Sequence, residues 1–172
     1  MSYSTLYLLN KKSTREVKDF RNGWGSCPLC WDYLAEVYFA DLNFTDYNRT
    51  DYIGFDRKWK MVWALADTDR LKSCEMLALK MTFDYAYVPI THLAEAGEEC
   101  REFHKLSSAL PSFVNHVNHW EDIGLTLLEL SQRKFSLHTR GVVLNGTSVN
   151  NIWWSPTKER LENAWPIYEE AA

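Results

Sequence analysis

Apolar residues recur at helical spacing along most of the chain. Trp59, Val62, Trp63 and Ala66, for example, would share one face of a helix. Polar residues such as Ser13, Ser26 and Thr91, which favour helix N-termini, precede several of these segments. The pattern predicts helices over residues 13–20, 26–42, 57–71, 72–83, 91–106, 118–132 and 155–164.

Two other segments are typical of β-strands. Thr5–Leu9 is a short apolar run rich in strand-forming residues. Asn145 and Gly146 lie between Val-Val-Leu and Thr-Ser-Val, a pattern that favours a two-residue hairpin turn. We therefore expect an α+β fold: a mostly helical single domain over residues 1–172, with a small antiparallel sheet made of the N-terminal strand and the C-terminal hairpin.

Composition and charge narrow the classes of partner. The 172 residues include eight tryptophans, and aromatic residues make up 15%, so the chain buries much apolar area or presents some of it to a partner. The net charge of −4 argues against nucleic acid, whose phosphates require clustered Lys and Arg. No apolar run reaches the ~18 residues of a membrane span, and the N-terminus does not resemble a signal peptide. We expect a cytoplasmic protein with no membrane partner.

The pair Cys27 and Cys30 is the strongest chemical motif. A C-x-x-C at a helix N-terminus is a place where a thiolate is stabilised. The letters CPLC also resemble the C-P-x-C active-site motif of glutaredoxin-like proteins. That fold needs a buried strand before the first cysteine, whereas residues 18–26 have the composition of a loop. A thiol-redox or zinc-dependent enzyme centred on this pair is the alternative function.

Zinc could be bound if His116 and His119 completed a C-x-x-C…H-x-x-H site. However, 85 residues separate Cys30 from His116, whereas compact zinc modules keep the two pairs within about 12–20. Reduced cysteines on amphipathic helices usually pack as small apolar residues. We therefore assign no catalytic residue, no metal and no cofactor.

Candidate contact residues come from the tryptophans and an acidic segment. Trp153 and Trp154 follow the expected hairpin, where neighbours in an extended segment point to opposite faces. Trp24 lies between two glycines, and tryptophan is strongly enriched among binding hot spots. Aspartates recur every five residues in a polar loop that lacks the turn glycine of a calcium site and would form an acidic rim: Asp41, Asp46, Asp51 and Asp56.

Four short stretches of the sequence resemble stretches of other proteins: NGWGSCPLCWDYL, MTFDYAYV, VNHW and GTSVNNIWW. They are similar to stretches of small proteins encoded by bacteriophages and prophages. The resemblance implies an accessory protein of the bacterial host cytoplasm that binds and blocks a host enzyme or defence complex. It implies no catalytic residue. Our hypothesis is a non-enzymatic protein-binding module, monomeric or dimeric, that acts on a host protein by occlusion.

Overall fold

An antiparallel hairpin opens the chain and forms one edge of a β-sheet. In this computed structural model the described residues are 3–41, 59–148, 151–152 and 161–169. Strand β1 (Tyr3–Asn10) pairs with β2 (Thr14–Arg21) along its whole length. Leu6 pairs with Lys18 and Tyr7 with Glu16, so a β-bulge at Val17 interrupts the register.

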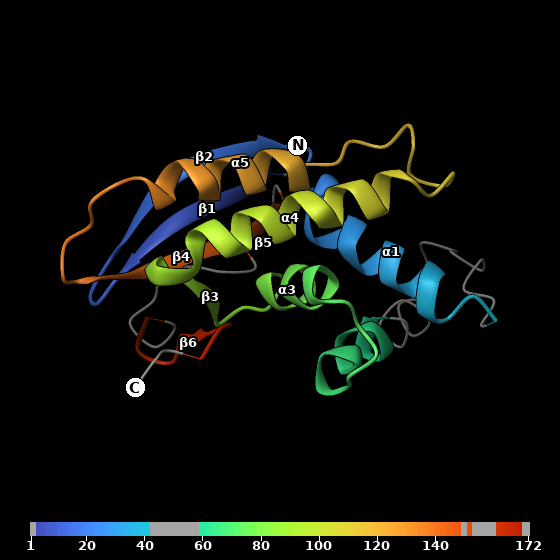
Figure 1. Cartoon of the computed structure of the whole chain (residues 1–172), viewed down its shortest axis with the longest axis horizontal. Helices are drawn as coiled ribbons and strands as arrows, with labels where there is room; N and C mark the ends of the chain where they lie inside the picture. The colour runs from blue at the N-terminus through green and yellow to red at the C-terminus, as the bar shows by residue number, and fades with distance from the viewer. Residues whose placement is uncertain (1–2, 42–58, 149–150, 153–160, 170–172) are drawn as a thin grey trace.

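The sheet is mixed and draws on both ends of the chain (Figure 1). Its strand order is β2-β1-β4-β3-β6, with β5 paired to the end of β4. The parallel pair is β3 with β6, and the remaining pairs are antiparallel. The later strands are β3 (Ala86–Pro89), β4 (Thr139–Ser148), β5 (Asn151–Ile152) and β6 (Trp165–Pro166).

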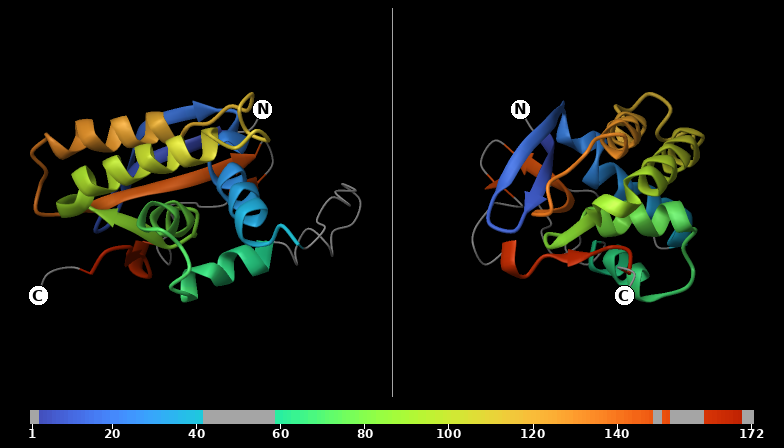
Figure 2. Two further views of the ribbon diagram at one scale, coloured as in Figure 1. Left: turned by 45° about the vertical axis from the view of Figure 1, so that its right-hand side comes forward. Right: turned by 60° about the vertical axis from the view of Figure 1, so that its left-hand side comes forward.

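The helices gather on one side of the sheet (Figure 2). Helices α4 and α5 lie side by side and cross closely at Gly97 and Gly124, where an added Cβ on Gly124 would lie 2.6 Å from the Gly97 carbonyl oxygen. Residues 59–64 are also helical. The α-helices are α1 (Cys27–Tyr38), α3 (Ser73–Met81), α4 (Leu93–Ser108) and α5 (Trp120–Ser131); the 3-10 helices are η1 (Gly23–Gly25), η2 (Leu65–Asp67) and η3 (Ile90–His92).

Alternation along the strands produces two apolar clusters, one on each face of the sheet. Leu6 and Leu144 point into the main core beneath the helices. Leu9 and Val143 point to the opposite face, where Leu161 and other C-terminal residues cover them. Residues of the C-terminal segment therefore cover the apolar side chains on the face of the sheet opposite the helices.

Three expectations about the strands were wrong. Residues 13–20, expected to form a helix, lie almost entirely in strand β2 (Thr14–Arg21); the strand was missed because an edge strand packs on few neighbours and its many charged residues hide the alternation. Asn145 and Gly146 do not form a turn; they pair with Thr5 and Ser4 inside β4, since a continuous ladder with β1 outweighs a local turn preference. The sheet is mixed rather than small and antiparallel, because β3 and β6 are parallel; the expected antiparallel pairing of the N-terminal strand with a C-terminal strand is present between β1 and β4.

Most of the helices were predicted correctly. Helices α1, α3, α4 and α5 fall within or close to the predicted ranges, and the α+β class is confirmed. The N-cap residue of α5 is His119, and the preceding Asn118 accepts a hydrogen bond from the Trp120 backbone N–H through its Oδ1 at 3.1 Å. The Glu121 carboxylate, in the first turn of α5, pairs with Arg101 of α4 at 3.1 Å.

Candidate binding surface

Trp24 projects from a short turn whose backbone is buried. It is the middle residue of η1, and the glycines on either side of it are both buried. The Trp24 side chain is 49% exposed. An indole this exposed does not fill the core, whereas the backbone that carries it belongs to the packed interior.

Hydrogen bonds from three sides hold this turn. Ser26 donates to the Gly23 carbonyl oxygen through its backbone N–H at 3.2 Å and its hydroxyl at 2.8 Å. His119 donates its backbone N–H to the Gly25 carbonyl oxygen at 2.8 Å. The His119 ring nitrogen Nε2 lies 2.5 Å from the Arg21 carbonyl oxygen, which can only accept, so Nε2 carries a proton. Together these bonds fix the direction in which Trp24 projects.

The glycines are required by close packing. A Cβ on Gly25 would lie 2.6 Å from the Val117 carbonyl oxygen, and a Cβ on Gly23 would lie 2.9 Å from the Tyr3 carbonyl oxygen. Asn22 enters the turn with φ of 63°, a left-handed conformation that Asn tolerates better than most residues. The sequence Asn-Gly-Trp-Gly therefore reflects the geometry of this turn.

Two exposed valines lie in the loop that packs against the turn. Val117 is 47% exposed and touches the turn through its backbone, and Val114 is 65% exposed three residues earlier. We call Trp24, Val114 and Val117 the Trp24 patch. These three exposed side chains belong to two segments that pack against each other, and exposed apolar side chains with a tryptophan are typical of the centre of a protein interface.

The other predicted contact residues do not join this patch. Asp41 is exposed in the turn that follows α1, whereas Trp24 lies just before the start of that helix. The twelve residues of α1 separate the two by about 18 Å. The remaining predicted contacts lie outside the described residues: Asp46, Asp51, Asp56, Trp153 and Trp154.

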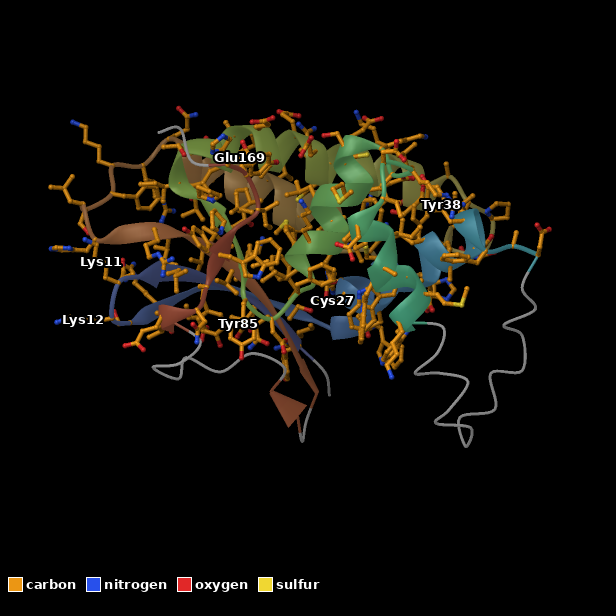
Figure 3. The ribbon with its side chains drawn as sticks, turned by 90° about the horizontal axis from the view of Figure 1, so that it is seen from below. Lys11, Lys12, Cys27, Tyr38, Tyr85 and Glu169 are labelled. Carbon is orange, nitrogen blue, oxygen red and sulfur yellow. The ribbon has the colours of Figure 1, made fainter. Side chains whose placement is uncertain are left out.

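Cys27, labelled in Figure 3, and Cys30 occupy the first turn of α1, as expected, and both thiols are buried. Burial raises the pKa of Cys27 to about 12 and raises the pKa of Cys30 well above its usual value. Thiol exchange and metal binding both need the thiolate, which this environment disfavours. Cys74 and Cys100 are also buried, free thiols.

The two histidines of the zinc hypothesis make different contacts. His119 is next to the cysteine turn, but its ring binds backbone carbonyls. His116 is exposed and its ring contacts Phe113. Among the residues that the structure describes, no group of three or more His, Cys, Asp or Glu side chains could hold a metal ion.

Sequence reasoning missed Val114, Val117 and the role of His119. The two valines sit in a loop without regular spacing, so no pattern marked them as surface residues. The sequence offered His119 as a possible zinc ligand, but it does not show that this residue positions the turn that carries Trp24.

None of the helices in the described parts of the chain combines the length and apolar character needed to span a bilayer. Comparisons with protein-family models, with curated proteins and with solved structures found no match to the chain.

Proposed function

We propose that the protein is a non-enzymatic protein-binding module and that the Trp24 patch is its contact surface. The observation that carries the proposal is the contrast between an exposed indole and a backbone that is buried and held by hydrogen bonds. A contact residue held in place before binding loses little conformational freedom when a partner arrives, which favours affinity. A tryptophan that only sealed the edge of the core would be buried rather than half exposed.

The partner is a protein of the bacterial host, which this protein blocks by covering a functional surface. This part of the proposal rests on the resemblance to small phage-encoded and prophage-encoded proteins in several phrases of the sequence. The residues of the patch carry no formal charge, so burial of apolar area supplies most of the binding free energy.

The proposal is tested by affinity capture from bacterial lysate with matched variants. Wild-type protein is compared with Trp24→Ala and with Trp165→Ala, which truncates a second exposed tryptophan outside the patch. We expect one host protein, recovered in near-equal amount, to bind the wild type and Trp165→Ala and to be lost with Trp24→Ala.

Binding measurements with the purified partner then give the loss of affinity caused by Trp24→Ala. Truncation of a hot-spot tryptophan costs roughly 2 kcal/mol or more, which weakens the Kd by about 30-fold. Circular dichroism of Trp24→Ala must match that of the wild type, because the indole is not a core residue. Equal capture of every retained protein by Trp24→Ala and wild type would show that this surface is not the contact site.

A further inference from the structure

The charges of the chain are segregated along the sequence. Residues 1–15 contain Lys11, Lys12 and Arg15 and no Asp or Glu. Residues 130–158 contain four further Lys or Arg residues and again no Asp or Glu. These seven of the 19 cations leave 12 to balance all 23 carboxylates in the rest of the chain. The net charge of −4 therefore averages a basic part and a strongly acidic part.

The fold brings the two carboxylate-free segments together. Strand β1 pairs with β4 throughout, and the Lys11 backbone N–H donates to the His138 carbonyl oxygen at 3.1 Å. The β1–β2 turn and the loop between α5 and β4 thus lie next to each other at one end of the molecule. The side chains of Lys11 and Lys12 point outward from this end (Figure 3).

Four of the cations at this end are free to bind a ligand. Lys11, Lys12, Arg15 and Lys134 are exposed, and none forms an ion pair within the described part of the chain. By contrast, Arg133 pairs with a glutamate, and Arg140 donates to two backbone carbonyls. We call the four free cations, together with Leu137, the basic end.

We propose that the basic end binds the phosphate backbone of duplex DNA, independently of sequence and separately from the Trp24 patch. Clustered Lys and Arg side chains that are not paired with carboxylates are what binding to phosphates requires. The hydroxyls of Ser13 and Ser136, both exposed in the same two connections, are further donors of the kind that contact phosphates.

A duplex fits this end better than a single strand does. Single strands are held by stacking on exposed aromatic rings, and Phe135, in the same loop, is only partly exposed and packs against the main core. Leu137 is instead 97% exposed next to the cations. An apolar side chain flanked by cations can contact the groove while the cations hold the backbone, as in minor-groove binders.

The basic end and the Trp24 patch lie at opposite ends of β2. Lys11 and Lys12 precede the strand and Trp24 follows it, so its eight residues separate the two surfaces by about 26 Å. One molecule can therefore hold DNA and a protein partner at the same time.

Fluorescence anisotropy with a short labelled DNA duplex tests the proposal. Four phosphate contacts predict a slope of log K against log salt concentration of roughly −3.6, or about 100-fold weaker binding at about 200 mM than at about 50 mM salt. The variant Lys11→Gln/Lys12→Gln/Lys134→Gln removes three contacts, so its slope falls to about −1 and its affinity in low salt falls at least tenfold.

A control variant that loses the same number of charges tests whether DNA binding depends on the position of the lysines or only on the net charge of the protein. Lys60→Gln/Lys72→Gln/Lys105→Gln removes the same charge from exposed lysines elsewhere, and we expect less than a twofold change in affinity. Leu137→Ser weakens binding without changing the salt slope. Trp24→Ala leaves DNA binding unchanged, so this proposal and the proposed protein-binding function fail separately.

Three results would overturn the inference. The first is no binding of the duplex in low salt. The second is an equal loss of affinity in the two triple variants, which would make the effect one of net charge alone. The third is salt-sensitive binding to vesicles of anionic lipid by wild-type protein that does not bind the duplex.

Discussion

A buried carboxylate joins α1 to α3 and allows a quantitative test of the fold. Glu75 is 1% exposed and accepts hydrogen bonds from the hydroxyls of Tyr33, at 2.8 Å, and Tyr38, and from the Lys72 backbone N–H at 2.9 Å. Tyr33 is the partner of Oε1, and the other two donors share Oε2. Tyr33→Phe therefore leaves Oε1 buried without a donor, at a cost of about 2–3 kcal/mol.

The cost is measured by urea unfolding at neutral pH, followed by tryptophan fluorescence. With a slope of about 2 kcal/mol per M urea for a chain of this size, the midpoint falls by roughly 1–1.5 M. Tyr38→Phe is the matched control, because Tyr38 is partly exposed and Glu75 Oε2 keeps the Lys72 N–H; we expect about 1 kcal/mol or less.

A double-mutant cycle tests whether the loss of stability comes from the hydrogen bond between Tyr33 and Glu75. In a Glu75→Met background the Tyr33 hydroxyl has lost its acceptor, so Tyr33→Phe becomes neutral or stabilising. An unchanged midpoint for Tyr33→Phe alone, or the same loss in both backgrounds, would refute the reasoning that the buried carboxylate depends on this hydroxyl.

The same site predicts how stability depends on pH. Burial, followed by the hydrogen bond to Glu75, raises the pKa of Tyr33 and of Tyr38 above the usual value of about 10. The unfolded phenols lose their protons first, so this contribution is complete below about pH 10 and is lost as the pH rises further. Tyr33→Phe should make the alkaline decline of the unfolding free energy shallower than in the wild type.

Three further predictions concern other parts of the fold. Gly97→Ala or Gly124→Ala should lower the unfolding free energy by about 1–3 kcal/mol in denaturant titrations, although alanine is the better helix former, because the new Cβ meets the facing helix. Cys27 and Cys30 should resist a thiol reagent at mildly alkaline pH until urea unfolds the chain; rapid labelling of the native protein would contradict their burial. Arg140→Lys should speed proteolysis of the C-terminal segment while leaving the melting of the helices nearly unchanged, because lysine cannot donate to two carbonyls as the guanidinium does.

The helices could be predicted because the spacing of apolar residues within each helix is visible in its own sequence. Helices α4 and α5 present one apolar face to the core, and that face is visible in the local sequence. Strand β2 could not be predicted in this way, since its conformation comes from pairing with β1 rather than from its own residues. Asn145 could not be predicted for the same reason. Its turn preference is visible in the neighbouring residues, whereas its pairing with Thr5 depends on a distant strand.

The candidate surface was only partly predictable for a related reason. Trp24 between two glycines indicated an exposed aromatic residue in a turn, and the structure places it there. The residues that complete the patch come from a loop about 90 positions later, and no local pattern links the two. The interpretation of Cys27 and Cys30 as small packing residues is confirmed, because both thiols are buried in the core at the first turn of α1.

The pairing of β1 with β4 also has a consequence for biosynthesis. Thr5 pairs with Asn145, so 140 residues must be made after Thr5 before its partner in β4 exists. At a synthesis rate of about 5–20 residues per second, this interval lasts about 7–28 s. A lone two-stranded hairpin is at best marginally stable in water. The sheet therefore forms only after β4 has been synthesised, and a truncation before β4 yields a chain that cannot assemble the sheet.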